Sequence, residues 1–116
     1  MSDFGNGIRK KREKRYEGDS TYSVRKTAGR VGIEPSYLSK IERGEQPPPS
    51  ERAIILLAKE LDLDTDVLLA QAGKISGDVR EAILRKPETL PGIIRKLGRK
   101  SKQELAGLLA EYKNGQ

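Results

Sequence analysis

The side chains of this chain that could do chemistry are mostly cations. Its 116 residues include 23 Lys and Arg against 17 Asp and Glu, a formal net charge of +6. There is no His and no Cys, which excludes imidazole base catalysis, thiolate chemistry, disulfides and zinc sites built from these residues. An excess of cations favours a polyanionic partner, with nucleic acid first and an acidic membrane surface second.

Two short patterns resemble reactive sites but lack the companions that such sites need. Ser23 and Lys26 have the S-x-x-K spacing of acyl-enzyme hydrolases, yet no second motif of those enzymes is present. The aspartates of residues 62–66 begin like a calcium-binding loop, but Val67 and Gly73 stand where Gly and Glu are required. We therefore expect no enzyme activity, no metal site and no cofactor, and aspartates that cap a helix.

The charge lies in two basic blocks separated by an acidic one. Residues 1–44 hold 11 Lys and Arg against 6 Asp and Glu, and residues 74–116 hold 10 against 5. Residues 45–73, between them, hold 2 against 6.

The length of the chain suits one small domain with an appendage. We expect a domain over residues 1–73 and a helical extension over residues 74–116.

Apolar residues recur at helical spacing along most of the chain, and no stretch alternates as a strand would. The stripes at i, i+3, i+4 and i+7 begin at Val24, Ile54, Leu90 and Leu105. The class is therefore all-α, with about five helices followed by about three more. The helices are predicted over 4–15, 23–31, 35–43, from Ser50, from Asp64 to before Gly73, and over 77–86, 88–97 and 102–113. Ser101 and Glu104 have the spacing of a capping box.

The longest purely apolar run covers residues 53–58, far short of the ~20 residues that span a bilayer. The N-terminus also lacks the apolar stretch of a signal peptide. We expect a soluble cytoplasmic protein with no membrane partner.

The informative spacing is between the second and third predicted helices. Only residues 32–34 separate them, which forces a steep crossing angle instead of an antiparallel return. Gly32 suits a left-handed helix end, and Pro35 suits a first helical turn. Such a pair can hold its second helix outward with its first turn exposed, the geometry that enters a major groove ~12 Å wide.

The residues of this unit resemble a known family. Residues 27–44 read TAGRVGIEPSYLSKIERG, which is similar to the helix-turn-helix of lambda-repressor-like, Cro/XRE-type transcriptional regulators. The resemblance covers about residues 4–73 and rests most on YLSKIERG at 37–44. It implies a five-helix DNA-binding domain followed here by about three C-terminal helices.

The resemblance also implies roles for individual residues. Residues of the third helix that would face base edges are Pro35, Ser36, Tyr37 and Lys40. Tyr37 is expected to be exposed to DNA, with a place in the core as the alternative. Phosphate contacts are assigned, with the help of the basic patch at 9–15, to Arg9, Lys10, Ser23, Arg25, Ser39 and Arg43. Arg12 resembles the first-helix arginine that forms a structural ion pair with the glutamate ending the third helix, here Glu42.

Two features depart from the family pattern. Family members usually carry Gln at the second position of the second helix, where this chain has Val24, so Ser23 or Arg25 would have to replace its bracing contact. The segment between Arg12 and Ser23 is also about five residues longer than usual. It could add phosphate contacts or be a mobile excursion.

The leading hypothesis is a sequence-specific regulator of transcription, a repressor that binds double-stranded DNA. Regulators of this type usually bind palindromic operators as dimers, and residues 77–113 are the expected homodimer contact. Those helices could instead fold back as an intramolecular cap. The alternative function is an antitoxin-type module whose C-terminal helices bind a protein partner as well.

Overall fold

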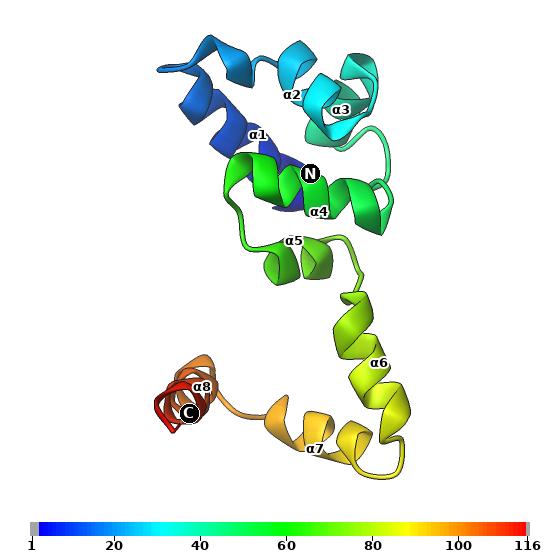
Figure 1. Ribbon diagram of the computed structural model, residues 1–116, viewed down its shortest axis with the longest axis vertical. Coiled ribbons are helices and arrows are strands. Elements are labelled where there is room, and N and C mark those ends of the chain that lie inside the picture. The colour runs from blue at the N-terminus through cyan, green and yellow to red at the C-terminus, as the bar shows by residue number, and fades with distance from the viewer. Residues whose placement is uncertain (1–2, 116) are drawn as a thin grey trace. The chain divides into compact units, whose positions relative to one another are not determined.

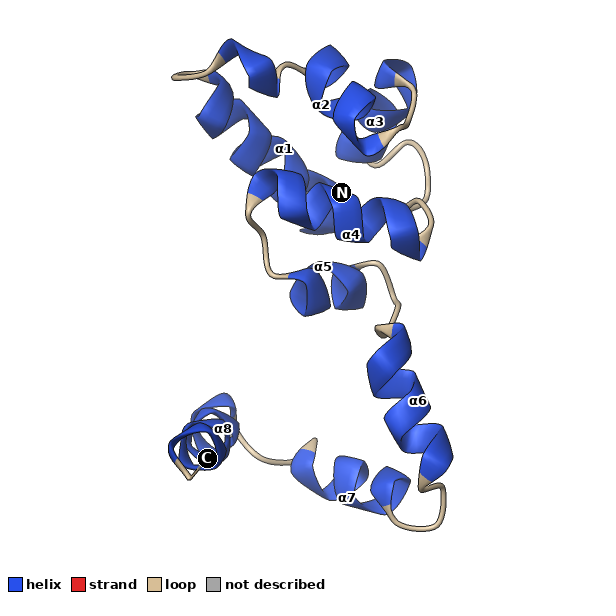
Figure 2. Cartoon of the chain, viewed as in Figure 1, coloured by secondary structure: helices blue, strands red, loops and turns tan. Residues whose placement is uncertain are grey.

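The structure, a computed structural model, describes residues 3–115. This part of the chain is entirely helical, with eight α-helices, one short 3-10 helix and no strand (Figures 1 and 2). The predicted all-α class, with five helices followed by three, is confirmed. The elements are α1 (Asp3–Tyr16), η1 (Ser20–Tyr22), α2 (Val24–Val31), α3 (Pro35–Glu42), α4 (Glu51–Leu61), α5 (Thr65–Gln71), α6 (Gly77–Arg85), α7 (Leu90–Leu97) and α8 (Lys102–Asn114).

The chain divides into two compact units, Met1–Ser76 and Gly77–Gln116. Helices α1 to α5 belong to the first unit, and α6 to α8 belong to the second. The division follows Ser76, a few residues after the boundary expected at Gly73, because α6 does not begin until Gly77.

Side-chain caps start several helices where the sequence predicts them. The Ser50 hydroxyl accepts a hydrogen bond from the Ala53 amide at 3.2 Å, and the Asp64 carboxylate accepts one from the Val67 amide at 3.0 Å. Ser101 forms the predicted capping box at the start of α8. Each cap satisfies an amide that has no partner within its helix, so these boundaries follow from local chemistry.

Two segments differ from the prediction. Residues 20–22, expected to be irregular, form η1, because the Asp19 carboxylate accepts hydrogen bonds from both the amide and the hydroxyl of Thr21. Helix α7 begins at Leu90 instead of residue 88. The preceding residues form a turn, and Pro91 suits the first turn of a helix.

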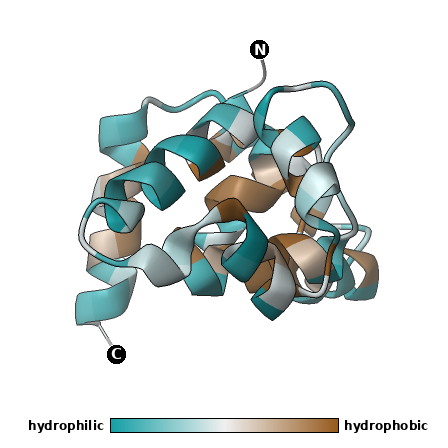
Figure 3. Ribbon diagram, turned by 90° about the horizontal axis from the view of Figure 1, so that it is seen from above, coloured by the Kyte–Doolittle hydropathy of each residue, from teal (hydrophilic) through white to brown (hydrophobic). Residues whose placement is uncertain are grey.

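One apolar face from each of α1 to α5 builds the core of the first unit. On several helices in Figure 3, brown apolar turns lie beside teal polar ones, as expected of helices with one buried stripe. The largest fully buried apolar side chains are Phe4, Ile8, Leu38, Ile41, Ile54, Leu57, Leu61 and Leu69. Burying each of them contributes about 1.5–3 kcal/mol, and together they fix how α1, α3 and α4 pack.

Helix α1 passes very close to the end of α3 at Gly5. A Cβ placed on Gly5 would lie 2.3 Å from the main-chain oxygen of Ile41 and 3.1 Å from that of Glu42. Real side-chain carbons do not approach oxygen this closely, so only glycine permits the contact. The missing side chain of Gly5 therefore helps to set the position of α3.

Candidate nucleic-acid interface

Helix α3 presents two chemically different faces. Leu38, Ile41 and Glu42 are buried against the rest of the first unit, whereas Ser36 and Lys40 are exposed. The turn before α3 ends α2 at Gly32, whose φ of 86° is the left-handed conformation expected there. Helix α3 is thus fixed along one side and offers hydrogen-bond donors on the other.

The other residues expected to reach bases or phosphates on α3 are half-buried. Pro35 occupies the first turn, and Ser39 lies one turn later. Tyr37 is also half-buried and packs against the core. It is therefore neither fully exposed, as a contact with DNA would favour, nor fully buried, as a core residue would be. Of the proposed base-reading residues, Ser36 and Lys40 are therefore the ones most open to a ligand.

Arg12 and Glu42 form a buried, two-pronged ion pair between α1 and α3. The Arg12 Nε donates to Glu42 Oε2 at 2.7 Å, and its Nη2 donates to Oε1 at 2.9 Å. The hydrogen bond to Glu42 raises the pKa of Arg12 above its ordinary value. Breaking one side of such a buried pair costs about 3–5 kcal/mol, because it leaves the other charge without a partner.

Two of the three arginines expected to contact phosphate, Arg9 and Arg43, are exposed and already pair with carboxylates. Arg9 pairs with Glu13 one turn along α1, with 3.5 Å between Nε and Oε2. Arg43 donates to Glu45, and this hydrogen bond holds the pKa of the Glu45 carboxyl below its ordinary value. Exposed pairs of this kind contribute little to stability, so a phosphate can replace the carboxylate at modest cost.

A hollow of about 220 Å³ brings several of these residues together. Its lining contains Arg9, Ser39 and Arg43, from the set expected to contact phosphate, and also both partners of the buried ion pair. Val24 lines the hollow too and packs against the core. Lys10 and Arg25 are exposed but do not belong to this lining.

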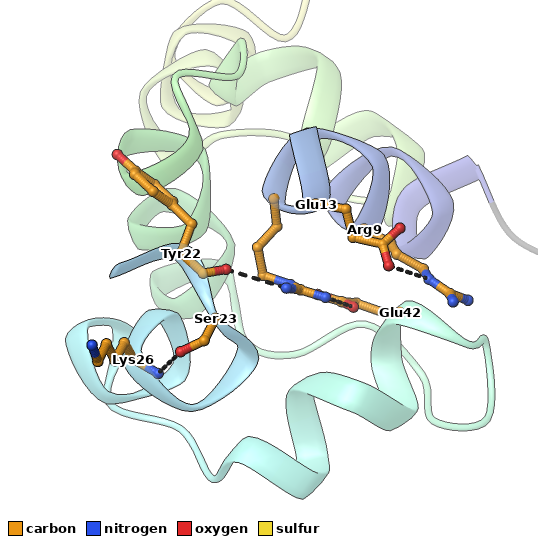
Figure 4. Close-up of polar contacts among 7 residues, drawn as sticks. Arg9, Glu13, Tyr22, Ser23, Lys26 and Glu42 are labelled. Atoms are coloured by element: carbon orange, nitrogen blue, oxygen red, sulfur yellow. Dashed lines mark hydrogen bonds and ion pairs between the residues drawn. The ribbon is translucent and has the colours of Figure 1, made fainter. Parts of the chain in front are cut away.

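Ser23 is the N-cap of α2, in addition to its expected contact with phosphate. Its hydroxyl accepts a hydrogen bond from the Lys26 amide at 3.2 Å and thereby caps α2, as Figure 4 shows. A hydroxyl can still donate to an anion while it accepts from an amide. The S-x-x-K spacing of Ser23 and Lys26 is thus a helix cap in this structure.

Comparison with known proteins places these observations in a family. The helix-turn-helix domain family matches residues 3–72 of the chain, and these residues contain α1 to α5. The chain belongs to the helix-turn-helix domain family. Its resemblance to lambda-repressor-like, Cro/XRE-type regulators is confirmed, and the family match supports the role of a DNA-binding regulator.

One solved structure has a similar fold over nearly the whole chain. It is described as a complex of SinR protein and SinI protein, is 24% identical, covers 97% of this chain and 99% of its own, and has a TM-score of 0.50. A likeness at this identity establishes the fold alone. No curated protein sequence matches the chain.

The helix-turn-helix domain contains a polar network that the sequence patterns do not predict. Tyr22 and Arg30 both connect η1 to neighbouring helices. A signal was present in the added residues between α1 and α2, where Tyr22 is an aromatic residue close in sequence to several arginines. Periodicity analysis overlooks such a residue because it lies outside any helical stripe.

Two aspartates at the ends of the domain's last helices have structural roles. Asp64 caps α5, and Asp62 ends α4 in a left-handed conformation. Within residues 3–115, no three acidic side chains gather into a group that could hold a metal ion. Across the same residues, no helix combines the length and apolar character needed to cross a bilayer.

Proposed function

We propose that this protein is a sequence-specific regulator of transcription, acting as a repressor, that reads the major groove of double-stranded DNA with α3. The observation that carries the proposal is the two-faced character of α3. One face is locked by core packing and by the ion pair between Arg12 and Glu42, while Ser36 and Lys40 on the other remain open. A rigid support with exposed donors is what reading of base edges requires.

Base contacts and backbone contacts come from different residues in this proposal. Ser36 and Lys40 donate to base edges, with Pro35 and Tyr37 forming the apolar part of the same surface. Phosphates are held by Arg9, Ser39 and Arg43 around the hollow, by Ser23 and Arg25 at the start of α2, and by Lys10 on α1. The regulator is non-enzymatic, requires no cofactor or metal and works in the cytoplasm.

A mobility-shift titration with duplex DNA at two salt concentrations tests the phosphate contacts. Each contact should lower log K by about 0.9 per unit of log salt. Arg9→Ala should weaken binding to all duplexes alike and should reduce the slope of log K against log salt by about 0.9, the value for one contact. Binding that is insensitive to salt, or no binding to any duplex, would refute the proposal.

Selection from a randomised duplex library tests whether α3 reads bases. Lys40→Ala should change the preferred sequence and cost about 1–3 kcal/mol at the base that it contacts. Lys59→Ala is the matched control, since Lys59 is an exposed lysine on α4. An unchanged preference in Lys40→Ala would show that α3 lies along the DNA without reading it.

Homodimerisation through residues 77–113 is the second part of the proposal. No described residue of α6, α7 or α8 is buried. Large apolar side chains are exposed on all three helices, namely Val79, Leu84, Ile93, Ile94, Leu105, Leu108, Leu109 and Tyr112. Pairing with a second copy would bury them and would place two α3 helices on the half-sites of a palindromic operator, ~34–36 Å apart.

Light scattering of the full-length protein tests the dimer. Leu109→Glu should give monomers and weaken operator binding, because a charge would enter the apolar contact. Val67→Glu is the control, since both side chains are 55% exposed but Val67 lies on α5 of the first unit. A monomeric wild type, or equal effects of both substitutions, would contradict this contact.

The same exposed apolar surface supports a second candidate, an antitoxin-type role in which α7 and α8 cover a protein partner. Co-expression of this protein with the product of a small neighbouring reading frame distinguishes binding of a protein partner from self-association. A stable heteromeric complex that Leu109→Glu abolishes would favour the partner, whereas a wild-type homodimer indifferent to that product would favour self-association.

A further inference from the structure

The added residues between α1 and α2 form a compact connection closed by local hydrogen bonds. Asp19 accepts from the Thr21 amide at 2.9 Å and from its hydroxyl at 2.6 Å. The Tyr22 amide donates to the Asp19 carbonyl at 3.1 Å, and the Ser23 amide donates to the Ser20 carbonyl at 3.3 Å. These hydrogen bonds fix the position of Tyr22 beside α1 and α2.

Two arginines hold the side chain of Tyr22 at that place. The guanidinium carbons of Arg15 and Arg30 lie over its ring, 5.3 Å and 5.2 Å from the centroid. Arg15 also donates from Nη1 to the Tyr22 hydroxyl at 3.0 Å. The ring is half-buried and packs against the core, so the cations attract its face in a partly desolvated setting.

Arg30 connects this arrangement to the rest of the domain. Its Nη1 donates to the Thr21 carbonyl at 2.7 Å, and its Nε pairs with Glu60 on α4 at 2.6 Å. Arg15 projects from α1, and Arg30 projects from α2. The ring of Tyr22 is therefore held by cations from two helices. Each cation also pairs with an acidic residue of α4 or its C-cap, Arg30 with Glu60 and Arg15 with Asp62 at 3.9 Å.

The main chain of Tyr22 reaches the support of α3. Its carbonyl accepts from Arg12 Nη1 at 3.2 Å, while the Nε and Nη2 of the same guanidinium hold Glu42. Figure 4 shows this line of hydrogen bonds from Tyr22 to Glu42. A guanidinium donates in fixed directions, so moving the Tyr22 carbonyl turns the group that holds the end of α3.

We propose that Tyr22 is a positioning residue of the DNA interface. Its ring, held by Arg15 and Arg30, places the carbonyl that orients Arg12 and, through Glu42, orients α3. This assignment rests on the proposed function, because it concerns how α3 is presented to DNA.

Three full-length variants separate the ring from its hydroxyl and from simple bulk. Tyr22→Phe keeps the aromatic face and loses only the hydrogen bond from Arg15. Tyr22→Leu keeps an apolar side chain against the core and loses the attraction for cations. Tyr16→Leu is the control, because Tyr16 is a tyrosine at the end of α1 with 49% of its surface exposed.

Two readouts are measured well below the melting temperature. The first is hydrogen exchange of the Arg12 Nε–H signal in an NMR spectrum, which reports the ion pair directly. The second is affinity for a duplex selected from a randomised library by the wild type. Tyr22→Leu should speed the exchange and weaken the affinity, each by about tenfold, equivalent to about 1.4 kcal/mol. Tyr22→Phe and Tyr16→Leu should stay within about twofold of the wild type.

The outcomes are distinct. Arg12 exchange in Tyr22→Leu that matches the wild type would overturn the assignment, as would a lower melting temperature with unchanged exchange and affinity. Tyr22→Phe behaving like Tyr22→Leu would also overturn it, because the ring would then not be the acting group. A wild type that binds no duplex would defeat the proposed function, while the exchange measurement would still decide whether Tyr22 orients Arg12.

Discussion

The close approach of α1 to α3 at Gly5 predicts opposite effects for two substitutions on one helix. Gly5→Ala would place a methyl carbon 2.3 Å from the Ile41 carbonyl oxygen, whereas relaxed carbon–oxygen contacts are about 3.3 Å. The obstacle is main chain, so α1 and α3 would have to separate by about 1 Å. Gly7→Ala, also on α1, meets nothing within 4 Å.

The expected magnitudes follow from these environments. Overpacking at a tight contact costs about 1–3 kcal/mol, and the same separation would strain the ion pair between Arg12 and Glu42. At Gly7 the added methyl only reduces the freedom of the unfolded chain and raises helix propensity, a gain of about 0.5–1 kcal/mol. The two variants should therefore differ in the free energy of unfolding by roughly 1.5–4 kcal/mol.

Amide hydrogen exchange at Leu57 and Leu61 is the appropriate assay, because these core residues of α4 report the first unit without a contribution from the second. Urea unfolding midpoints provide a second measure. Gly5→Ala should also weaken duplex binding, since it displaces α3. The reasoning would be refuted if Gly5→Ala were as stable as the wild type, or if the two variants lost protection equally.

Three further predictions concern single side chains of the first unit. The Thr27 hydroxyl is buried and, within residues 3–115, has no hydrogen-bond partner. Thr27→Val should therefore raise the free energy of unfolding, measured by urea titration, by about 1 kcal/mol. A lower free energy of unfolding would show that the hydroxyl does have a partner. Asp62 adopts a left-handed φ of 53°, and Asp62→Gly should add about 0.5–1 kcal/mol by the same measurement; a lower midpoint would mean that its carboxylate matters more than its backbone strain. Hydrogen bonds from the hydroxyl and amide of Thr21 hold the pKa of Asp19 below its ordinary 3.8, so the stabilisation of η1 should be complete above that pH and disappear as the pH falls through the lowered pKa. The Thr21 amide shift followed by NMR should trace this loss, and Asp19→Asn should abolish the titration.

Local signals in the sequence were sufficient for most of the first unit's helices. Ser50 and Asp64 bond to amides three residues ahead, so the cap and its partner are close in the chain before anything folds. Gly32 meets a requirement of its own backbone. The family signature at residues 37–44 likewise lies within a single helix and its end, so it can be recognised without knowing what α3 packs against.

Contacts between distant residues could not be derived in this way. The attraction of Arg30 for Glu60 spans 30 residues, and the space that forbids a side chain at Gly5 is created by α3. The ion pair of Arg12 and Glu42 was anticipated only through the family resemblance. Its third contact, to the Tyr22 carbonyl, belongs to a connection that departs from the family.

The sequence by itself determined the helices, their order and the chemistry of the exposed face of α3, because capping, turn residues and apolar spacing act over a few residues. The tertiary structure alone decided how α3 is held, how deeply Tyr37 is buried and which residues the lengthened connection contacts. Each of those depends on the angle and distance at which helices pack. That geometry comes from the whole core at once, and no single segment encodes it.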